Sequence, residues 1–237
     1  MEQFEFTVLL PCLNEAKTIC KVIEKAKKCI EDNALSAEIL VADNGSTDGS
    51  QELAKAMGAR VVIIPQRGYG AALIGGTRAA QGKYCIMGDS DDSYDFSNLM
   101  PYAEKLREGY ALVMGNRYKG GIQKGAMPFL HRYLGTPVLS FIGRLLYGNK
   151  IGDYNCGMRG YNTKMFLDLD LQSTGMEYAS EMIVQASVHG YPMTEVPTTL
   201  SKAGRDRASH LNTWRDGWRH LKLLLSKTKE KQKLKQK

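Results

Sequence analysis

The sequence lacks the features that mark several large classes of protein. The longest apolar runs, such as residues 61–64 and 223–225, fall far short of the ~20 residues that a membrane-spanning helix needs. The first residues, MEQFEF, show no basic segment followed by an apolar core, so no secretory signal is predicted. The five cysteines include no C-x-x-C pair. They are predicted to be reduced thiols in a cytoplasmic chain.

Two glycine-rich phosphate-binding motifs are also missing. Gly68-x-Gly70 is followed by Leu73 rather than by a third glycine, which leaves the dinucleotide pattern G-x-G-x-x-G incomplete. No G-x-x-x-x-G-K-[ST] stretch occurs. Gly68-x-Gly70 is interpreted either as a turn that lets the backbone approach a ligand or as a simple strand-to-helix turn.

The positive charge is concentrated at one end of the chain. The net charge is +7, but residues 227–237 carry six lysines and one glutamate, or +5, which leaves about +2 for the rest. This tail is predicted to be disordered. The basic residues are not interleaved with aromatics beyond the two tryptophans, so nucleic acid is not a predicted partner.

Apolar and polar segments alternate in a way that predicts an α/β fold. Strands are predicted at 4–11, 37–42, 61–64 and 84–87, with helices from 18, from 48 and over 67–81 between them. This order predicts a mostly parallel central sheet flanked by helices, with right-handed crossovers. Further along, we expect helices over 98–108, 131–147 and 176–189, strands at 111–115 and 193–197, and a loop over 151–161. The 131–147 helix is apolar on more than one side, which predicts that it is packed.

Four carboxylates follow the strand at 84–87: Asp89, Asp91, Asp92 and Asp95. Like charges this close repel, so the cluster favours a counter-charge. A hard divalent cation such as Mg²⁺ or Mn²⁺ fits, because it prefers carboxylate oxygen and can also bind phosphate. The carboxyl end of a strand is where ligands of open α/β sheets bind. The simpler interpretation is an acidic turn in which Asp92 or Asp95 caps the next helix.

Two other acidic motifs come near this stretch. A helix-loop-helix calcium site counted from Asp89 would need Gly at position 94 and Glu at position 100, where the chain has Tyr94 and Met100. The phosphatase pattern Asp-x-Asp-x-Thr is nearer, with Asp89, Asp91 and Ser93, and it would make Asp89 a nucleophile.

The end of the chain predicts an amphipathic helix. Leu211, Trp214, Trp218, Leu221 and Leu225 recur every three or four residues, with basic residues off the stripe. The helix is interpreted either as docked on the protein's own core or as lying on a membrane surface. The predicted organisation is a catalytic domain over residues 1–210, this interfacial helix over 211–226, and the lysine-rich tail over 227–237.

Several stretches together resemble the family 2 nucleotide-sugar glycosyltransferases, which have the Rossmann-like A-type fold, and within them the polyprenyl-phosphate branch that includes dolichyl-phosphate mannosyltransferases. The resemblance covers roughly residues 5–220. Its stretches are Pro11-x-x-Asn14-Glu15, residues 43–48, Asp89-Ser90-Asp91, and residues 115–118, 153–161, 177–181 and 201–207.

The resemblance implies a role for each matching residue. Nucleotide binding is expected of Pro11, Asn14, Glu15, Asp43, Asn44, Gly70, Asp89 and Ser90. Mg²⁺ or Mn²⁺ on the donor diphosphate is expected at Asp89 and Asp91, with Ser93 where relatives commonly carry an amide. The acceptor phosphate is expected at Arg117, Arg159, Lys202, Arg205 and Arg207. Asp89, Asp91, Arg117 and Arg205 are the predicted catalytic residues.

The predicted reaction is inverting transfer of a hexose from a nucleotide-diphosphate sugar to a polyprenyl phosphate, by an enzyme peripheral on the cytoplasmic membrane face through residues 211–237. An anionic phosphate acceptor needs no general base, whereas a hydroxyl acceptor would need one. Asp153 and Glu181 are the candidates for that base. The alternatives are transfer to a hydroxyl, a metal-dependent phosphatase, and a non-catalytic binding module. A homo-oligomer is left open.

Overall fold

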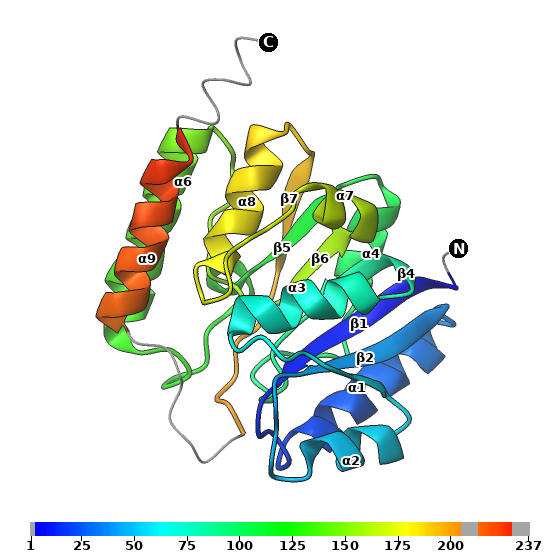
Figure 1. The fold of residues 1–237 in the computed structure, drawn as a ribbon. Helices are drawn as coiled ribbons and strands as arrows, with labels where there is room; N and C mark the ends of the chain where they lie inside the picture. The colour runs from blue at the N-terminus through cyan, green and yellow to red at the C-terminus, as the bar shows by residue number, and fades with distance from the viewer. Residues whose placement is uncertain (1–2, 205–212, 229–237) are drawn as a thin grey trace.

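The protein, in a computed structural model that describes residues 3–204 and 213–228, is built on one seven-stranded sheet in the order β3-β2-β1-β4-β6-β5-β7. Helices cover both of its faces (Figure 1). The strands are β1 (Phe4–Cys12), β2 (Ala37–Asp43), β3 (Arg60–Ile63), β4 (Gly82–Met87), β5 (Leu112–Asn116), β6 (Arg159–Asn162) and β7 (Met193–Pro197).

The first four strands are parallel, as the sequence predicts. β1 pairs with β2 and β4, and β2 pairs with β3. Helices α1 (Ile19–Asp32), α2 (Ser50–Ala56) and α3 (Tyr69–Ala79) connect them. The interiors of β1, β2 and β4 are buried, which explains why these strands read as continuous apolar runs. Their carboxyl ends meet at one edge of the sheet.

β6 begins at Arg159, inside the stretch 151–161 that the sequence predicts to be a loop, so the loop prediction is wrong for residues 159–161. β6 runs antiparallel to both β4 and β5 and completes the sheet between them. Its sequence, RGYN, has neither a β-branched residue nor a clear alternation, and tertiary pairing determines its conformation.

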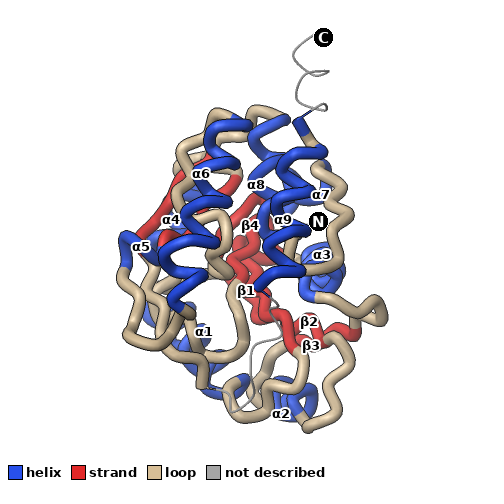
Figure 2. Tube along the Cα trace, turned by 90° about the vertical axis from the view of Figure 1, so that its left-hand side faces the viewer, coloured by secondary structure: helices blue, strands red, loops and turns tan. Residues whose placement is uncertain are grey.

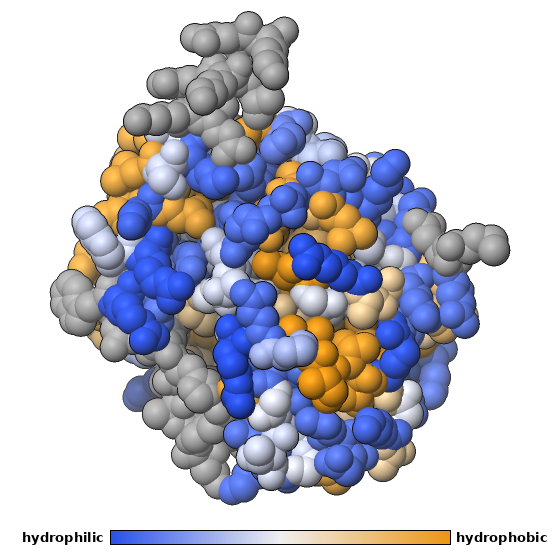
Figure 3. Space-filling model, in the orientation of Figure 1, coloured by the Kyte–Doolittle hydropathy of each residue, from blue (hydrophilic) through white to orange (hydrophobic). Residues whose placement is uncertain are grey.

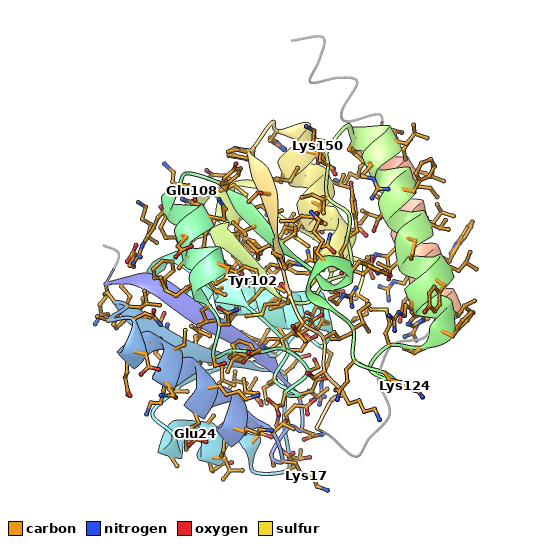
Figure 4. The ribbon with its side chains drawn as sticks, turned by 180° about the vertical axis from the view of Figure 1, so that it is seen from behind. Lys17, Glu24, Tyr102, Glu108, Lys124 and Lys150 are labelled. Carbon is orange, nitrogen blue, oxygen red and sulfur yellow. The ribbon has the colours of Figure 1, made fainter. Side chains whose placement is uncertain are left out.

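The helices lie in layers on the two faces of the sheet. α3, α7 (Thr163–Asp168) and α8 (Tyr178–Val188) cover the face toward the viewer in Figure 1. α1 and α4 (Met100–Arg107) cover the other face, where Figure 4 shows Glu24 on α1 and Tyr102 on α4. The described chain also contains α5 (Arg117–Gly120), the π-helical turn η1 (His131–Gly135), α6 (Thr136–Tyr147) and α9 (Thr213–Ser226).

α6 and α9 lie side by side at the end of the sheet beyond α8 (Figures 1 and 2). α9 is anchored to its neighbours by His220, whose Nδ1 lies 2.7 Å from Ser180 Oγ, and by Arg219, which donates to Glu177 at 2.8 Å. The buried side chains of α9 include Asp216, His220 and Leu224, whereas Trp218 and Leu225 are exposed. α9 is therefore docked on the domain and still presents part of its predicted apolar stripe outward.

No helix in residues 3–204 and 213–228 combines the length and apolarity required to cross a membrane.

Candidate nucleotide and metal site

The predicted donor residues converge at the carboxyl edge of β1, β2 and β4. Cys12 at the end of β1 is in register with Asp43 at the end of β2, and Leu9 with Met87 at the end of β4. The loops that begin with Leu13, Asn44 and Gly88 therefore leave the sheet next to one another. This places Asn14, Glu15, Asp43 and Asp89 around one edge, as expected for a ligand site of an α/β sheet.

Asp43 is fully buried and its two oxygens differ. Oδ1 accepts hydrogen bonds from the backbone N–H of Gly45 (2.9 Å) and Ser46 (3.0 Å) and from Gln51 Nε2 (2.8 Å). Oδ2 is buried and has no hydrogen-bond partner among the described residues. A buried acceptor without a partner is costly, so Oδ2 is suited to receive a donor from a ligand such as the N–H of a nucleobase.

Asn14 and Glu15 hold the loop that follows Asp43. Asn14 has a left-handed φ of 57°. Its backbone N–H donates to Ser46 Oγ at 2.9 Å, and its side-chain oxygen accepts from the Thr47 N–H at 2.8 Å. The Glu15 N–H donates to Ser50 Oγ at 2.9 Å. The loops after β1 and β2 thus form one hydrogen-bonded wall beside Asp43.

Asp89 and Asp91 occupy the turn after β4. Asp89 Oδ1 accepts a hydrogen bond from the Tyr69 hydroxyl at 2.9 Å. Burial, followed by the negative charge of Asp89, raises the pKa of Tyr69 well above its usual value, so Tyr69 remains a donor. A Cβ on Gly157 would lie 2.6 Å from Asp89 Oδ2. Gly157 therefore allows the Asp89 carboxylate to lie close to the backbone at position 157.

Ser93 supports Asp91. Both the N–H (3.1 Å) and the hydroxyl (2.5 Å) of Ser93 donate to Asp91 Oδ1. In this arrangement Ser93 orients the Asp91 carboxylate. Its predicted role as a metal ligand stays a prediction. Among the described residues, no group of three acidic, His or Cys side chains converges as a closed metal cage. The donor set that fits a hard cation is the Asp-x-Asp pair, completed by oxygens from phosphate or water.

The other two carboxylates of the cluster have different surroundings. Asp92 forms ion pairs with Lys21 (2.6 Å) and Lys25 (2.7 Å). Burial opposes ionisation, but the two lysines hold the pKa of Asp92 below its usual value. Asp95 is exposed and accepts hydrogen bonds from the N–H and hydroxyl of Ser97. Repulsion among the four carboxylates therefore does not determine the structure of this turn. Two lysines neutralise Asp92, and Asp95 is exposed to solvent.

Three residues predicted to bind nucleotide, Asn44, Ser90 and Gly70, contact other parts of the protein in this structure. Asn44 donates to the carbonyls of Ile64 (3.0 Å) and Gln66 (2.7 Å). The Ser90 hydroxyl donates to the Pro11 carbonyl. A Cβ on Gly70 would clash with the carbonyl of Ser173, so this glycine allows residues 173–175 to approach α3. The segment that lies against the Gly68-x-Gly70 backbone is therefore residues 173–175 of the protein itself.

Arg117 lies in a buried ion pair. Its Nε and Nη2 each donate to Asp153 at 2.7 Å. Burial disfavours the charge, but Tyr94 and Asp153 raise the pKa of Arg117 well above its usual value. Glu195 holds this loop in turn, because it accepts hydrogen bonds from the N–H groups of Gly152 (2.6 Å) and Asp153 (3.1 Å). Asp153 is thus a structural partner of a cation.

Arg159 is the clearest correction. It is 1% exposed, and its guanidinium donates to the carbonyls of Cys156, Ala179 and Tyr154. A buried guanidinium that holds three carbonyls organises the interior, and the expectation that it binds acceptor phosphate is wrong. Lys202 is exposed, and its N–H donates to Gln123 Oε1. Arg205 and Arg207 lie outside the described residues.

Tyr69, Gly157 and Glu195 are the supporting residues that sequence reasoning did not identify. Tyr69 stands within the Gly68-x-Gly70 stretch, and Gly157 lies in a stretch that carried the resemblance. Nothing in the sequence pairs Glu195 with residues 152–153, which are more than 40 positions away.

A mostly parallel, helix-flanked sheet with an Asp-x-Asp pair at its carboxyl edge matches the A-type glycosyltransferase fold. The chain belongs to glycosyl transferase family 2, whose sequence profile matches residues 7–170.

Two similar proteins come from Haloferax volcanii. The low-salt glycan biosynthesis hexosyltransferase Agl6 is 37% identical over 220 residues, which are 92% of this chain and 52% of that protein. A dolichyl-phosphate hexose transferase is 30% identical over 196 residues, 81% of each chain. The chain therefore spans about half the length of Agl6 and most of the second relative.

The fold is also found in solved structures. Glucosyl-3-phosphoglycerate synthase from Mycobacterium tuberculosis, in complex with Mn²⁺, UDP and phosphoglyceric acid, superposes with a TM-score of 0.70 at 22% identity over 95% of this chain and 78% of that one. The same enzyme with Mg²⁺ and UDP gives a TM-score of 0.71 at 22% identity, over 95% and 79%.

Proposed function

We propose that this protein is a metal-dependent, inverting glycosyltransferase that moves a hexose from a nucleotide-diphosphate sugar to a polyprenyl phosphate at the cytoplasmic face of a membrane. The observation that carries the donor half of this proposal is the buried, unpartnered Asp43 Oδ2 at the same sheet edge as Asp89 and Asp91. The acceptor half is supported by the dolichyl-phosphate hexose transferase among its relatives.

The nucleotide would bind with its base against Asp43, in the wall formed by the loops after β1 and β2. Asp89 and Asp91 would hold Mg²⁺ or Mn²⁺ on the diphosphate, with Tyr69 and Ser93 orienting the two carboxylates. When bound, a divalent ion stabilises the negative charge of a departing diphosphate as a Lewis acid.

The acceptor phosphate is itself an anion, so its oxygen can attack the sugar carbon without a general base. Cationic side chains are needed to bring two anions together, and Lys202, Arg205 and Arg207 are proposed for this role. Arg117 is also proposed to contribute positive charge to the acceptor site, with Asp153 holding its guanidinium in one orientation.

Transfer to a hydroxyl acceptor is less well supported by the geometry. It requires a base, and both sequence candidates have other partners. Asp153 is bound by Arg117, and Glu181 accepts hydrogen bonds from the N–H groups of Gln172 (3.1 Å) and Ser173 (2.8 Å).

The test is a donor screen with a panel of radiolabelled nucleotide sugars, run with and without polyprenyl phosphate and with and without a chelator. We expect one hexose to enter the organic phase only when polyprenyl phosphate and metal are both present. Transfer to a hydroxyl acceptor alone would overturn the assigned acceptor, and phosphate release without sugar transfer would favour the phosphatase alternative.

A further inference from the structure

α6 is apolar on its exposed side as well as on the side that packs against the domain. The side chains that it buries against the domain belong to Thr136, Ser140 and Tyr147, together with Gly143. Ser140 accepts a hydrogen bond from the Tyr154 N–H at 3.1 Å, and the Tyr154 ring packs directly on Gly143. Leu139, Ile142 and Leu146 are partly buried and also pack against the core, so the inward side of α6 combines small, polar and apolar groups.

Several large apolar side chains of residues 129–145 are exposed, so the expectation that the helix over 131–147 is packed holds on its inward side only. Phe129 is 77% exposed, Phe141 58% and Leu145 73%. Within residues 3–204 and 213–228, seven of the thirteen exposed large apolar side chains lie on this one segment. They are Phe129, Leu130, Tyr133, Leu134, Val138, Phe141 and Leu145. A patch of this kind marks an interaction surface.

α9 extends the same surface. It packs beside α6, and its exposed Trp218 and Leu225 add to the patch. Figure 2 looks onto this pair of helices, and Figure 3 shows apolar residues gathered at the upper left, where α9 lies in front of α6 in Figure 1. We call the seven side chains on 129–145, together with Trp218 and Leu225, the α6–α9 face.

The charges around the α6–α9 face have one sign. Residues 129–147 contain no Asp or Glu, and in 213–226 Asp216 alone is acidic and is 2% exposed. The basic residues on the two segments are Arg132, Arg144, Arg215, Arg219 and Lys222, and the sequence after α9 adds six lysines. Arg215 and Arg219 form ion pairs with Asp216 and Glu177, and the other basic residues supply the positive charge of the face. An apolar patch with a basic surround matches an anionic bilayer surface, where Trp, Phe and Leu enter the interface and each Lys or Arg strengthens the attraction to anionic lipid.

The face also begins next to the proposed acceptor site. The Tyr118 hydroxyl, one residue after Arg117, donates to the carbonyl of Arg132 in η1 at 2.8 Å. A lipid phosphate held near Arg117 would therefore have its hydrocarbon chain beside the apolar start of the α6–α9 face.

We infer that the α6–α9 face docks the protein on an anionic phospholipid surface, with η1 and α6 supplying most of the apolar contact. The inference rests on the proposed function for its purpose, but its evidence is the set of exposed apolar side chains at 129–145. It adds this segment to residues 211–237, through which the sequence predicts membrane contact. The rival occupant is a second copy of this chain, which would cover the same apolar stripe.

The test is sedimentation of the full chain with vesicles of phosphatidylcholine alone, or mixed one-to-one with phosphatidylglycerol. We expect binding to the mixed vesicles that weakens with added salt. The double variant Phe141→Ser/Leu145→Ser should lower the partition coefficient about tenfold or more, because both side chains lose apolar contact. Both positions are exposed, so the fold should be retained. The matched control is Leu53→Ser/Leu167→Ser, two exposed leucines on α2 and α7, which should bind like wild type.

Equal binding of wild type and Phe141→Ser/Leu145→Ser would overturn the inference, and so would an absence of binding to anionic vesicles. Light scattering that shows a wild-type dimer and a monomeric variant, without vesicle binding, would assign the face to a second copy.

A polyprenyl phosphate short enough to be water-soluble separates this result from the proposed function. We expect Phe141→Ser/Leu145→Ser to use that acceptor at the wild-type rate, because no bilayer is involved. If neither the wild type nor the variant used it, the proposed function would be contradicted, and the vesicle binding would stand as measured.

Discussion

The proposed donor side and the proposed acceptor side of the molecule are organised in opposite ways. On the proposed donor side, three loops distant in sequence leave β1, β2 and β4 at one edge of the sheet, and a buried oxygen of Asp43 remains without a partner among the described residues. On the proposed acceptor side, Arg117 is paired with Asp153, Arg159 is buried, and Val138, Phe141 and Leu145 of α6 are exposed. The first region is therefore a preformed polar site, and the second carries an exposed apolar surface.

The largest expected effect is on the donor side. Asp91→Asn removes a proposed metal ligand and should reduce sugar transfer by about 4 kcal/mol, or about a thousandfold, because Lewis-acid stabilisation of the leaving diphosphate is lost. The measurement is the initial rate of sugar transfer at saturating metal. Asp95→Asn, at an exposed turn of the same cluster, is the control and should stay close to wild type. Turnover of Asp91→Asn within tenfold of wild type would remove the metal assignment.

The second effect tests whether the acceptor side depends on its buried ion pair. Arg117 is 8% exposed, and Asp153→Asn leaves its buried guanidinium without a charged partner. The free energy of unfolding should therefore fall by about 3 kcal/mol or more. Urea unfolding followed by circular dichroism measures the change. Asp32→Asn, which breaks the exposed pair with Lys28, should cost well under about 1 kcal/mol. Similar losses for both variants would mean that the Arg117–Asp153 pair has no special weight.

The third effect concerns how α9 is held. Burial, followed by Arg159, lowers the pKa of His220 to about 4 from the ordinary 6.5, while Asp216 opposes the shift and Arg219 adds to it. The unfolded chain then binds a proton at higher pH than the folded one. Stability is fully present above pH 6.5 and is lost as the pH falls toward 4, by at most about 3 kcal/mol.

Urea unfolding at a series of pH values measures this dependence. His220→Asn, which cannot titrate, should be less stable than wild type at pH 7 and should show a smaller loss between pH 6.5 and 4. Parallel pH profiles for the two proteins would refute the role given to His220.

The fold on the donor side is readable from sequence because its signals are local. The runs that form β1, β2 and β4 are apolar and bounded by turn residues, and helix periodicity gives α1 directly. The family, fold and Asp-x-Asp position follow from those stretches. The ion-pair partners of Asp92 do not follow from the sequence, because Lys21 and Lys25 are about seventy positions away from it.

The acceptor side could not be predicted in the same way. Arg159 is typical of a phosphate ligand by residue type, and only the pairing of β6 with β4 and β5 places it in the interior. Apolar residues in 131–147 predict burial, and only the structure shows that Val138, Phe141 and Leu145 are exposed while Thr136, Ser140 and Gly143 are buried. Long-range pairing, rather than local pattern, decides both.

The smallest expected effect separates Asp92 from Asp91. Lys25→Gln removes one of the two ion pairs of Asp92 at a partly exposed position, so the free energy of unfolding should fall by less than about 1 kcal/mol. Sugar transfer should be nearly unchanged, because Asp92 is paired with lysines rather than assigned to the metal. A loss of turnover comparable to that of Asp91→Asn would place Asp92 in the donor site.

The most direct test of the central claim is calorimetric titration of a nucleoside diphosphate into the wild-type protein and the Asp89→Asn variant, with and without Mn²⁺. If the Asp-x-Asp carboxylates hold a cation on the donor diphosphate, Mn²⁺ will tighten binding to wild type by at least about tenfold, or 1.4 kcal/mol, and will have little effect on the variant. Equal affinity with and without Mn²⁺ in the wild-type protein would contradict the account.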